Sequence, residues 1–118
     1  MQAISLNALV EELLGVAREH NSGRAARTLH GGHEHFLRQT VIALAGGQEL
    51  SEHESPGEAT LQVLRGHVRL TAGELSCEGR AGDHLVIPPV RHALAAIEDS
   101  AVLLTVLADR SAAVAPAG

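Results

Sequence analysis

The spacing of apolar residues changes once along the chain, near residue 23. Before that point apolar side chains recur at helical spacing, at Leu6, Leu9, Val10, Leu13, Leu14 and Ala17. Ser5 or Asn7 is available as an N-cap, and His20-Asn21-Ser22-Gly23 supplies a stop signal. The pattern predicts one amphipathic helix over residues 6–20, whose apolar stripe packs on a sheet or on a second subunit.

From residue 24 onward, short apolar runs are divided by turn residues, a pattern typical of an all-β sandwich or barrel. Because so many short strands leave many edges, we expect a closed barrel or two packed sheets. The segments are then an N-terminal helix (1–23), a β-barrel (24–110) and a disordered tail (111–118). The runs predict strands at residues 25–30, 35–43, 49–53, 60–64, 67–71, 75–78, 84–87, 93–97 and 102–107.

Individual strands differ in how their two faces are patterned. Along residues 68–71 alternation places Val68 and Leu70 inward, with Arg69 and Thr71 outward. Residues 36–44 and 102–107 are apolar on both faces, so we expect the helix or a partner chain to cover them. A homodimer is the natural hypothesis.

The amino-acid composition argues against several classes of function. A formal net charge of −5, with nine arginines and no lysine, leaves no basic stripe for nucleic acid. The absence of lysine also excludes Schiff-base chemistry. The longest apolar run, residues 101–108, is too short to span a bilayer, and the N-terminus lacks the basic start of a secretory signal. We therefore expect a cytoplasmic protein with no nucleic-acid or membrane partner.

The single cysteine, Cys77, excludes an intramolecular disulfide and a four-cysteine zinc site. It lies in a predicted strand, and we expect it to be a small buried residue.

Two stretches place histidines after similar strand–turn–strand patterns. One runs from Gly47 to His53 and continues to the turn at Gly66; the other runs from Gly82-Asp83 through Ile87-Pro88-Pro89 to His92. Over residues 40–108 they resemble the paired signatures of the cupin family. The resemblance implies a small all-β cupin of the RmlC-like type, a double-stranded β-helix (jelly-roll barrel) after one helix. It also implies that His53 and His92 meet at one end of the barrel, where a metal or small molecule binds.

Only some of the metal ligands that the resemblance implies are present in this sequence. Metal-binding cupins typically use three histidines and one glutamate, and His53 and His92 match two of these positions. Ser55 stands where another histidine is expected, and Ala59 stands where the glutamate is expected; Glu58 is one place off, which aims it at the opposite face of a regular strand. We therefore expect a degenerate site; if one Fe, Mn, Ni or Zn ion is bound as a cofactor, His53 and His92 hold it with a third ligand from His35, His84, Glu58 or water.

Other polar residues are candidates for the pocket. His30, His33 and His35 form an H-x-x-H-x-H cluster; in a strand His33 and His35 share a face that can point toward the barrel mouth, whereas a turn leaves them solvated. His84 stands where the family is usually apolar, so it is a candidate pocket residue, and His67 is expected on the surface of its strand. The predicted ligand-binding residues are His35, His53, Gln62, His84 and His92.

Two functions follow from this pattern. The first is a small-molecule-binding module with a degenerate metal site, and the alternative is a metal-dependent oxygenase or isomerase that uses His53 and His92. A third hypothesis is a structural or regulatory dimer. An exposed cluster of Arg24, Arg27 and Arg38 would reopen the question of DNA binding.

Overall fold

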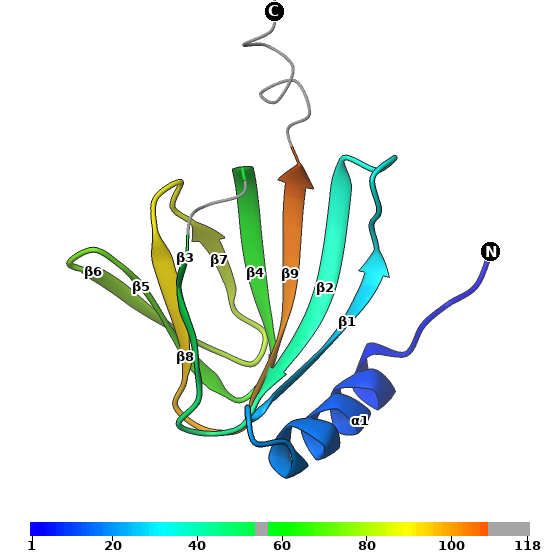
Figure 1. Cartoon of the computed structure of the whole chain (residues 1–118), viewed down its shortest axis with the longest axis horizontal. Helices are drawn as coiled ribbons and strands as arrows, with labels where there is room; N and C mark the ends of the chain where they lie inside the picture. Colours follow the sequence, from blue (N-terminus) through cyan, green and yellow to red (C-terminus); the bar gives the residue numbers. More distant parts are fainter. Residues whose placement is uncertain (54–56, 109–118) are drawn as a thin grey trace, which may run out of the picture.

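The computed structural model describes residues 1–53 and 57–108, with the backbone alone for Glu52 and His53. The predicted tail, residues 111–118, and the last two residues of the predicted barrel segment lie outside the described residues. One helix precedes nine strands in this part of the chain (Figure 1). They are α1 (Leu6–Glu19), β1 (Arg24–His30), β2 (Leu37–Leu44), β3 (Glu49–His53), β4 (Gly57–Arg65), β5 (His67–Ala72), β6 (Leu75–Arg80), β7 (His84–Ile87), β8 (His92–Ala96) and β9 (Ser100–Ala108).

The helix begins and ends where the sequence predicts, to within one residue. The Ala8 amide donates to Ser5 Oγ at 3.2 Å, so Ser5 is the N-cap. His20 has extended backbone angles and ends the helix. Gly23 then adopts a φ of 67°, in the left-handed region that favours glycine, and turns the chain into β1.

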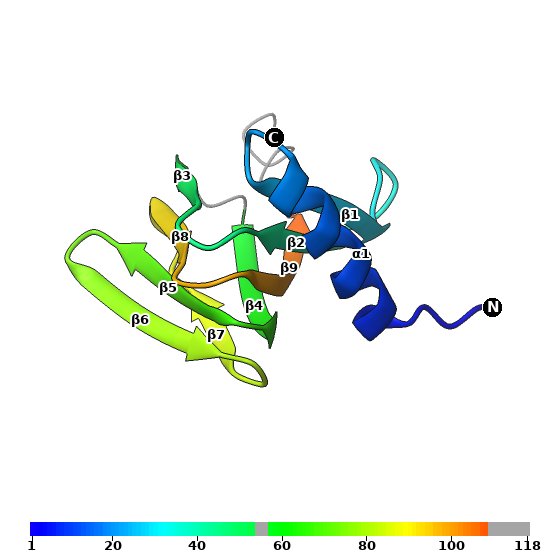
Figure 2. The same ribbon diagram turned by 90° about the horizontal axis from the view of Figure 1, so that it is seen from below.

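The strands form two antiparallel sheets that face each other (Figures 1 and 2). The five-stranded sheet has the order β1-β2-β9-β4-β7, and the four-stranded sheet has the order β3-β8-β5-β6. Aliphatic side chains from both sheets fill the space between them, among them Leu44, Leu61, Val63, Val68, Leu70, Leu94 and Val102. This arrangement confirms the predicted all-β jelly roll preceded by one helix.

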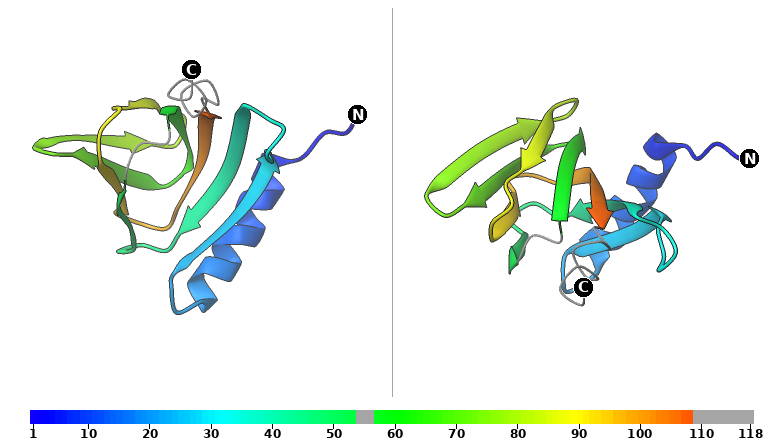
Figure 3. Two further views of the ribbon diagram at one scale, coloured as in Figure 1. Left: turned by 45° about the horizontal axis from the view of Figure 1, so that its top comes forward. Right: turned by 90° about the horizontal axis from the view of Figure 1, so that it is seen from above.

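A second core lies between α1 and the outer face of the five-stranded sheet. Leu9, Leu13 and Leu14 of the helix pack on Val41, Ala43 and Ala101, and Figure 3 shows α1 along β1 and β2, on the side away from β5 and β6. Three ion pairs tie the helix to the strands and their loops: Glu12 with Arg27, Arg18 with Asp99, and Glu11 with Arg65.

The helix covers only part of the two strands that are apolar on both faces. Val41 and Ala43 of β2 are fully buried beneath it, whereas Leu37 of β2 and Leu107 of β9 keep close to half of their surface exposed. The expected homodimer stays a prediction. No helix within residues 1–53 and 57–108 is long and apolar enough to cross a membrane.

The sandwich is open along one side. β6 and β7 are the outermost strands of their sheets, and the described residues pair neither of them with a further strand. The β5–β6 hairpin reaches outward on the side opposite α1 (Figures 1 and 2). Near Gly79 the inner face of β6 packs on Leu85 and Val63, whereas Leu75 and Cys77 on the same face are exposed.

Candidate functional site

The two histidines of the paired signatures lie opposite each other on neighbouring strands. His53 ends β3, His92 begins β8, and the two residues are Cα partners in the antiparallel register. Residues 39 positions apart in the sequence are thus adjacent in the four-stranded sheet. The register is irregular between Leu50 and His53, so a bulge precedes the first histidine.

The side chain of His92 is buried inside the sandwich, with 4% of the residue exposed. Its Nδ1 lies 2.8 Å from the carbonyl oxygen of Val90. Because a carbonyl oxygen only accepts, Nδ1 carries the proton and donates, which leaves Nε2 as the basic nitrogen of the neutral ring. A backbone carbonyl holding the far N–H is the arrangement that orients metal-binding histidines.

The space beside His92 is very small. It measures about 30 Å³ and is lined by Ile42, Leu50, Leu61, Leu70, Ile87, Leu94 and Leu104 together with the imidazole. A cavity needs roughly 10–15 Å³ to hold one water molecule. As lined by the described residues, this space has room for a water or a single ion beside His92.

The remaining expected metal ligands are not assembled around His92. Ala59 is 5% exposed and faces the interior, so its neighbour Glu58 lies on the opposite face and is exposed, as the register argument predicts. Ser55 lies outside the described residues. Within the described ranges no three His, Cys, Asp or Glu side chains come together to hold a metal ion. These residues do not complete a metal site.

Within the H-x-x-H-x-H cluster His30 ends β1, whereas His33 and His35 belong to a turn and not to the start of a strand. The His35 amide donates to the Gly32 carbonyl at 3.2 Å, and β2 begins only at Leu37. The ring of His35 lies against that of His30, with centroids 4.4 Å apart, and its Nε2 is 3.7 Å from Glu34 Oε1. His33 lines a different hollow. None of the three lines the space around His92.

Gln62 and His84 lie together, but on the outer face of the five-stranded sheet. They are register partners on β4 and β7, and both are exposed. Their neighbours Leu61 and Leu85 are buried in the core between the sheets. The structure therefore brings Gln62 and His84 to each other and separates both from His92 by the thickness of the sheet.

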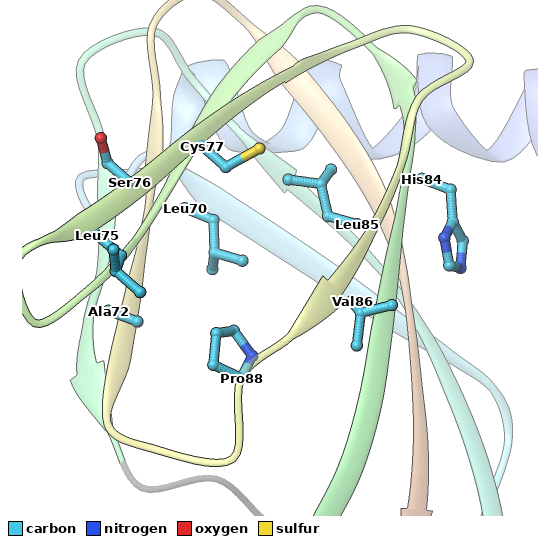
Figure 4. A pocket seen from close by; sticks show the side chains of 9 residues that line it. All are labelled: Leu70, Ala72, Leu75, Ser76, Cys77, His84, Leu85, Val86 and Pro88. Atoms are coloured by element: carbon cyan, nitrogen blue, oxygen red, sulfur yellow. The ribbon is translucent and has the colours of Figure 1, made fainter.

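A much larger cleft opens at the side of the sandwich, between the β5–β6 hairpin and β7. Its volume is about 360 Å³. In Figure 4 Leu70, Leu85, Cys77 and Pro88 lie around a common space, whereas the His84 ring lies apart and points away from it. The lining residues are Leu70, Ala72, Leu75, Ser76, Cys77, His84, Leu85, Val86 and Pro88.

The prediction of a buried Cys77 is wrong, because the thiol is exposed in this cleft. Cys77 is the register partner of Leu70, so it does face inward, as strand alternation requires. However, β6 is an edge strand and β7 does not close over it. Sequence reasoning missed the cleft because no local signal marks which two strands become the edges.

The expectation for His67 needs a smaller correction. Its imidazole is mostly buried, with 13% of the side chain exposed, and Nε2 lies 2.5 Å from Glu78 Oε1. Arg69 Nη2 donates to the other carboxylate oxygen at 3.2 Å. The hydrogen bond from His67, and then that from Arg69, holds the pKa of Glu78 below its usual range. This network joins β5 to β6 on the side away from the cleft.

Comparison with known proteins identifies the fold. No family model and no curated protein matches the chain. Among solved structures, it is similar to a conserved Streptococcus pyogenes protein of unknown function (32% identity, 75% of this chain and 76% of that one, TM-score 0.67). It is also similar to an RmlC-like cupin from Desulfovibrio desulfuricans (25% identity, 71% and 81%, TM-score 0.63).

A third similar structure is the salicylate 1,2-dioxygenase of Pseudoaminobacter salicylatoxidans in complex with gentisate, at 18% identity and a TM-score of 0.74. The match covers 92% of this chain but only 34% of that enzyme, so the likeness concerns the fold. Two facing antiparallel sheets, the His53–His92 pairing and these neighbours agree. The chain therefore belongs to the cupin superfamily and forms one of its small domains.

Proposed function

We propose that this cupin domain binds a small, mostly apolar molecule in the cleft between the β5–β6 hairpin and β7. The observation that carries the proposal is the contrast in volume between two spaces. The cleft measures about 360 Å³, whereas the space beside His92 measures about 30 Å³. Ligand pockets in proteins typically begin at roughly 300 Å³. Of these two spaces, only the cleft has room for an organic ligand.

The lining of the cleft indicates the chemistry of that ligand. Leu70, Leu75 and Leu85, with Val86 and Pro88, offer aliphatic surface to an apolar body. The polar side chains are few: Ser76 and Cys77 line the cleft, and His84 lies at its margin with its ring turned away from the common space (Figure 4). A molecule with an aliphatic or aromatic body and one polar substituent fits this distribution. Among the predicted ligand residues, His84 is the one that lines this cleft.

Cys77 provides the direct test, because it is the single cysteine of the chain and lies inside the cleft. We expect a thiol reagent such as Ellman's reagent to label native Cys77 readily. A panel of small metabolites can then be screened for protection of the thiol and for a rise in Tm. A ligand in the cleft should slow labelling at least about tenfold at saturation, because it covers the sulfur, and should raise Tm by linkage.

Two leucine substitutions provide a matched control. Leu75→Glu places a carboxylate in the cleft at a position that is 74% exposed, so the fold tolerates it. Leu107→Glu makes the same change at a site 45% exposed and outside the cleft. Protection by a hit should disappear in the first variant and persist in the second. If no metabolite protects Cys77, or if both variants bind a hit equally, the proposal is wrong.

A metal-dependent oxygenase or isomerase is the second candidate. One observation favours it: His53 and His92 are register partners, and Val90 holds His92 with Nε2 as its basic nitrogen. The space beside His92 is large enough for an ion. A bound Fe, Mn, Ni or Zn ion would act there as a Lewis acid. Against this candidate, the described residues supply no third protein ligand nearby.

Elemental analysis of untagged protein purified without chelator separates the two functions. A metal enzyme should contain close to one equivalent of metal, and His92→Ala should remove it. His84→Ala is the control, since that histidine is exposed on the outer face of β7. Metal below one tenth of an equivalent, or a content unchanged by His92→Ala, would contradict the metal hypothesis and leave the proposed binding module unaffected.

A further inference from the structure

A polar hollow lies at the end of the β1–β2 hairpin, distant from the cleft described above. Its volume is about 280 Å³, and it shares no lining residue with that cleft. Thr40 belongs to the same face of β2 as Ile42, which packs against the core between the sheets. From Ile42 toward the start of β2, this face becomes more exposed: Thr40 is half-buried and Arg38 is exposed to solvent. The hollow is lined by Thr28, Gly31, Gly32, His33, Arg38 and Thr40.

The guanidinium of Arg38 has no hydrogen-bond or ion-pair partner among the described residues, although the chain is acidic overall. Four other arginines are paired with carboxylates in the structure, namely Arg18, Arg27, Arg65 and Arg69. No carboxylate lines the hollow. The acid of the loop, Glu34, lies beside His35 and against Gly32, where a Cβ would be 3.3 Å from Glu34 Oε2, but it forms no ion pair with Arg38. Arg38 is therefore available to a bound anion.

Two hydroxyl groups stand beside this charge. Thr28 of β1 and Thr40 of β2 are register partners, so their side chains lie next to each other on one face of the hairpin. Each hydroxyl can donate one hydrogen bond. Donors from two strands thus converge on the hollow in which Arg38 lies.

The glycines of the loop bring the main chain close to these groups. A Cβ on Gly31 would lie 3.2 Å from Thr28 Cγ2 and 3.8 Å from Arg38 Cγ, so this wall of the hollow is bare backbone. Gly32 has a φ of 117°, which a residue with a side chain rarely adopts. The turn closed by the His35 amide then carries His33 to the hollow's edge.

We infer that this hollow binds the phosphate group of a small metabolite. The planar fork of Arg38 matches two phosphate oxygens, and the hydroxyls of Thr28 and Thr40 can reach the others. These donors come from β1 and β2, and donors from two strands can reach the oxygens on more than one side of a tetrahedral anion. The volume accommodates the phosphate with a short part of the molecule that carries it.

The placement of the other arginines argues against a polyanion such as DNA. Arg27 points to the helix side of the sheet, where it pairs with Glu12 at 2.7 Å. Arg24 faces the same way as Arg38, but its register partner on β2 is Leu44, which lies six residues along the strand from Arg38. That separation is about 20 Å along the strand. The three arginines do not form the cluster that would favour nucleic acid.

The probe is inorganic phosphate, added to ¹⁵N-labelled full chain at constant ionic strength while amide NMR shifts are followed. We expect saturable shifts centred on residues 28–40. Arg38→Gln should weaken phosphate binding about tenfold or more, because a charge-assisted hydrogen-bonded pair is lost. Arg24→Gln removes the same charge from the other end of the same face, and it should leave the affinity unchanged. Circular dichroism checks that both variants remain folded.

Two further titrations make the inference falsifiable. Chloride at the same ionic strength should give no saturable shifts in residues 28–40, and acetate should bind more weakly than phosphate. Equal binding of acetate and phosphate would overturn the assignment to phosphate. Affinity unchanged in Arg38→Gln, or lost equally in Arg24→Gln, would show only a general attraction of anions and would overturn the site itself. None of these outcomes bears on the cleft at Cys77.

Discussion

The space beside His92 and the cleft beside Cys77 share one wall, Leu70, yet they differ more than tenfold in volume. His92 lies on β8, between β3 and β5 in its sheet, and the opposite sheet covers it. Cys77 lies on β6, at the edge of its sheet, and is exposed in the cleft that β7 borders. In this protein the larger space lies beside an edge strand, and the strand that carries the signature histidine His92 lies inside its sheet beside the smaller space.

The same comparison shows where the interior is closely packed. Seven aliphatic residues surround His92, and they fill the described interior to within about 30 Å³. Dense packing of this kind stabilises the sandwich.

Leu70→Ala should have the largest effect, because it removes the wall shared by the two spaces. Leu70 is 5% exposed, and truncation of a buried leucine leaves a cavity. We expect a loss of about 3 kcal/mol in the free energy of unfolding, measured by urea denaturation. Leu75→Ala, on the open side of the cleft at 74% exposure, should change it by less than about 0.5 kcal/mol. Equal losses in the two variants would show that the cleft is closed in solution.

Gly79→Ala probes the point where the β5–β6 hairpin packs onto the opposite sheet. A Cβ there would lie 2.8 Å from Leu85 Cδ1 and 3.1 Å from Val63 Cγ2. Both neighbours are buried, so we expect a destabilisation of about 1–2 kcal/mol from overpacking. Ser76→Ala, at the exposed end of β6, is the control and should be close to neutral in the same denaturation experiment. A neutral Gly79→Ala would place the hairpin farther from the sandwich than the structure has it.

Glu78→Gln should have the smallest effect, and one that depends on pH. The bonds from His67 and Arg69 hold the pKa of Glu78 below its usual range, so its stabilising effect is complete above the unfolded-state pKa of a glutamate. That effect is lost as the pH falls through the lower, folded-state pKa. The Tm of wild type should therefore exceed that of Glu78→Gln by a few degrees at most near pH 6, and the difference should shrink as the pH falls below the ordinary glutamate pKa of about 4.3.

Glu74→Gln is the matched control for this experiment, because Glu74 lies in the turn of the same hairpin and forms no ion pair with a described residue. Its Tm difference from wild type should not change between pH 6 and pH 3. A pH-independent difference for Glu78→Gln would mean that the carboxylate does not hold β6 to β5.

The strand pattern predicted most of the fold because the signals for helix, strands and turns are local. Alternation along β5 assigned Val68 and Leu70 to the core and Arg69 to the surface, as observed. The one-residue offset of Glu58 from the family position correctly aimed it away from the interior. The strand predicted to begin at His35 starts at Leu37, because a turn closed by Gly32 occupies residues 32–35.

The orientation and exposure of the candidate site residues were harder to predict, because they depend on contacts with side chains far away in the sequence. Cys77 was predicted to be buried; it faces inward but is exposed. His84 faces outward because Leu85 and Ile87 take the inner positions of β7. The H-x-x-H-x-H cluster divides, with His35 against His30 and His33 beside Arg38.

The sequence alone determined the helix, the approximate positions of the nine strands between residues 24 and 108, and the inward positions of Val68 and Leu70; the resemblance to cupins added the pairing of His53 with His92. These follow from residue periodicity and turn chemistry, which act over a few residues. Only the tertiary structure decided which strands become edges, how tightly the interior closes around His92 and where a cleft and a polar hollow remain. Those outcomes depend on the order of strands in two sheets and on the packing of side chains across them, which no local pattern encodes.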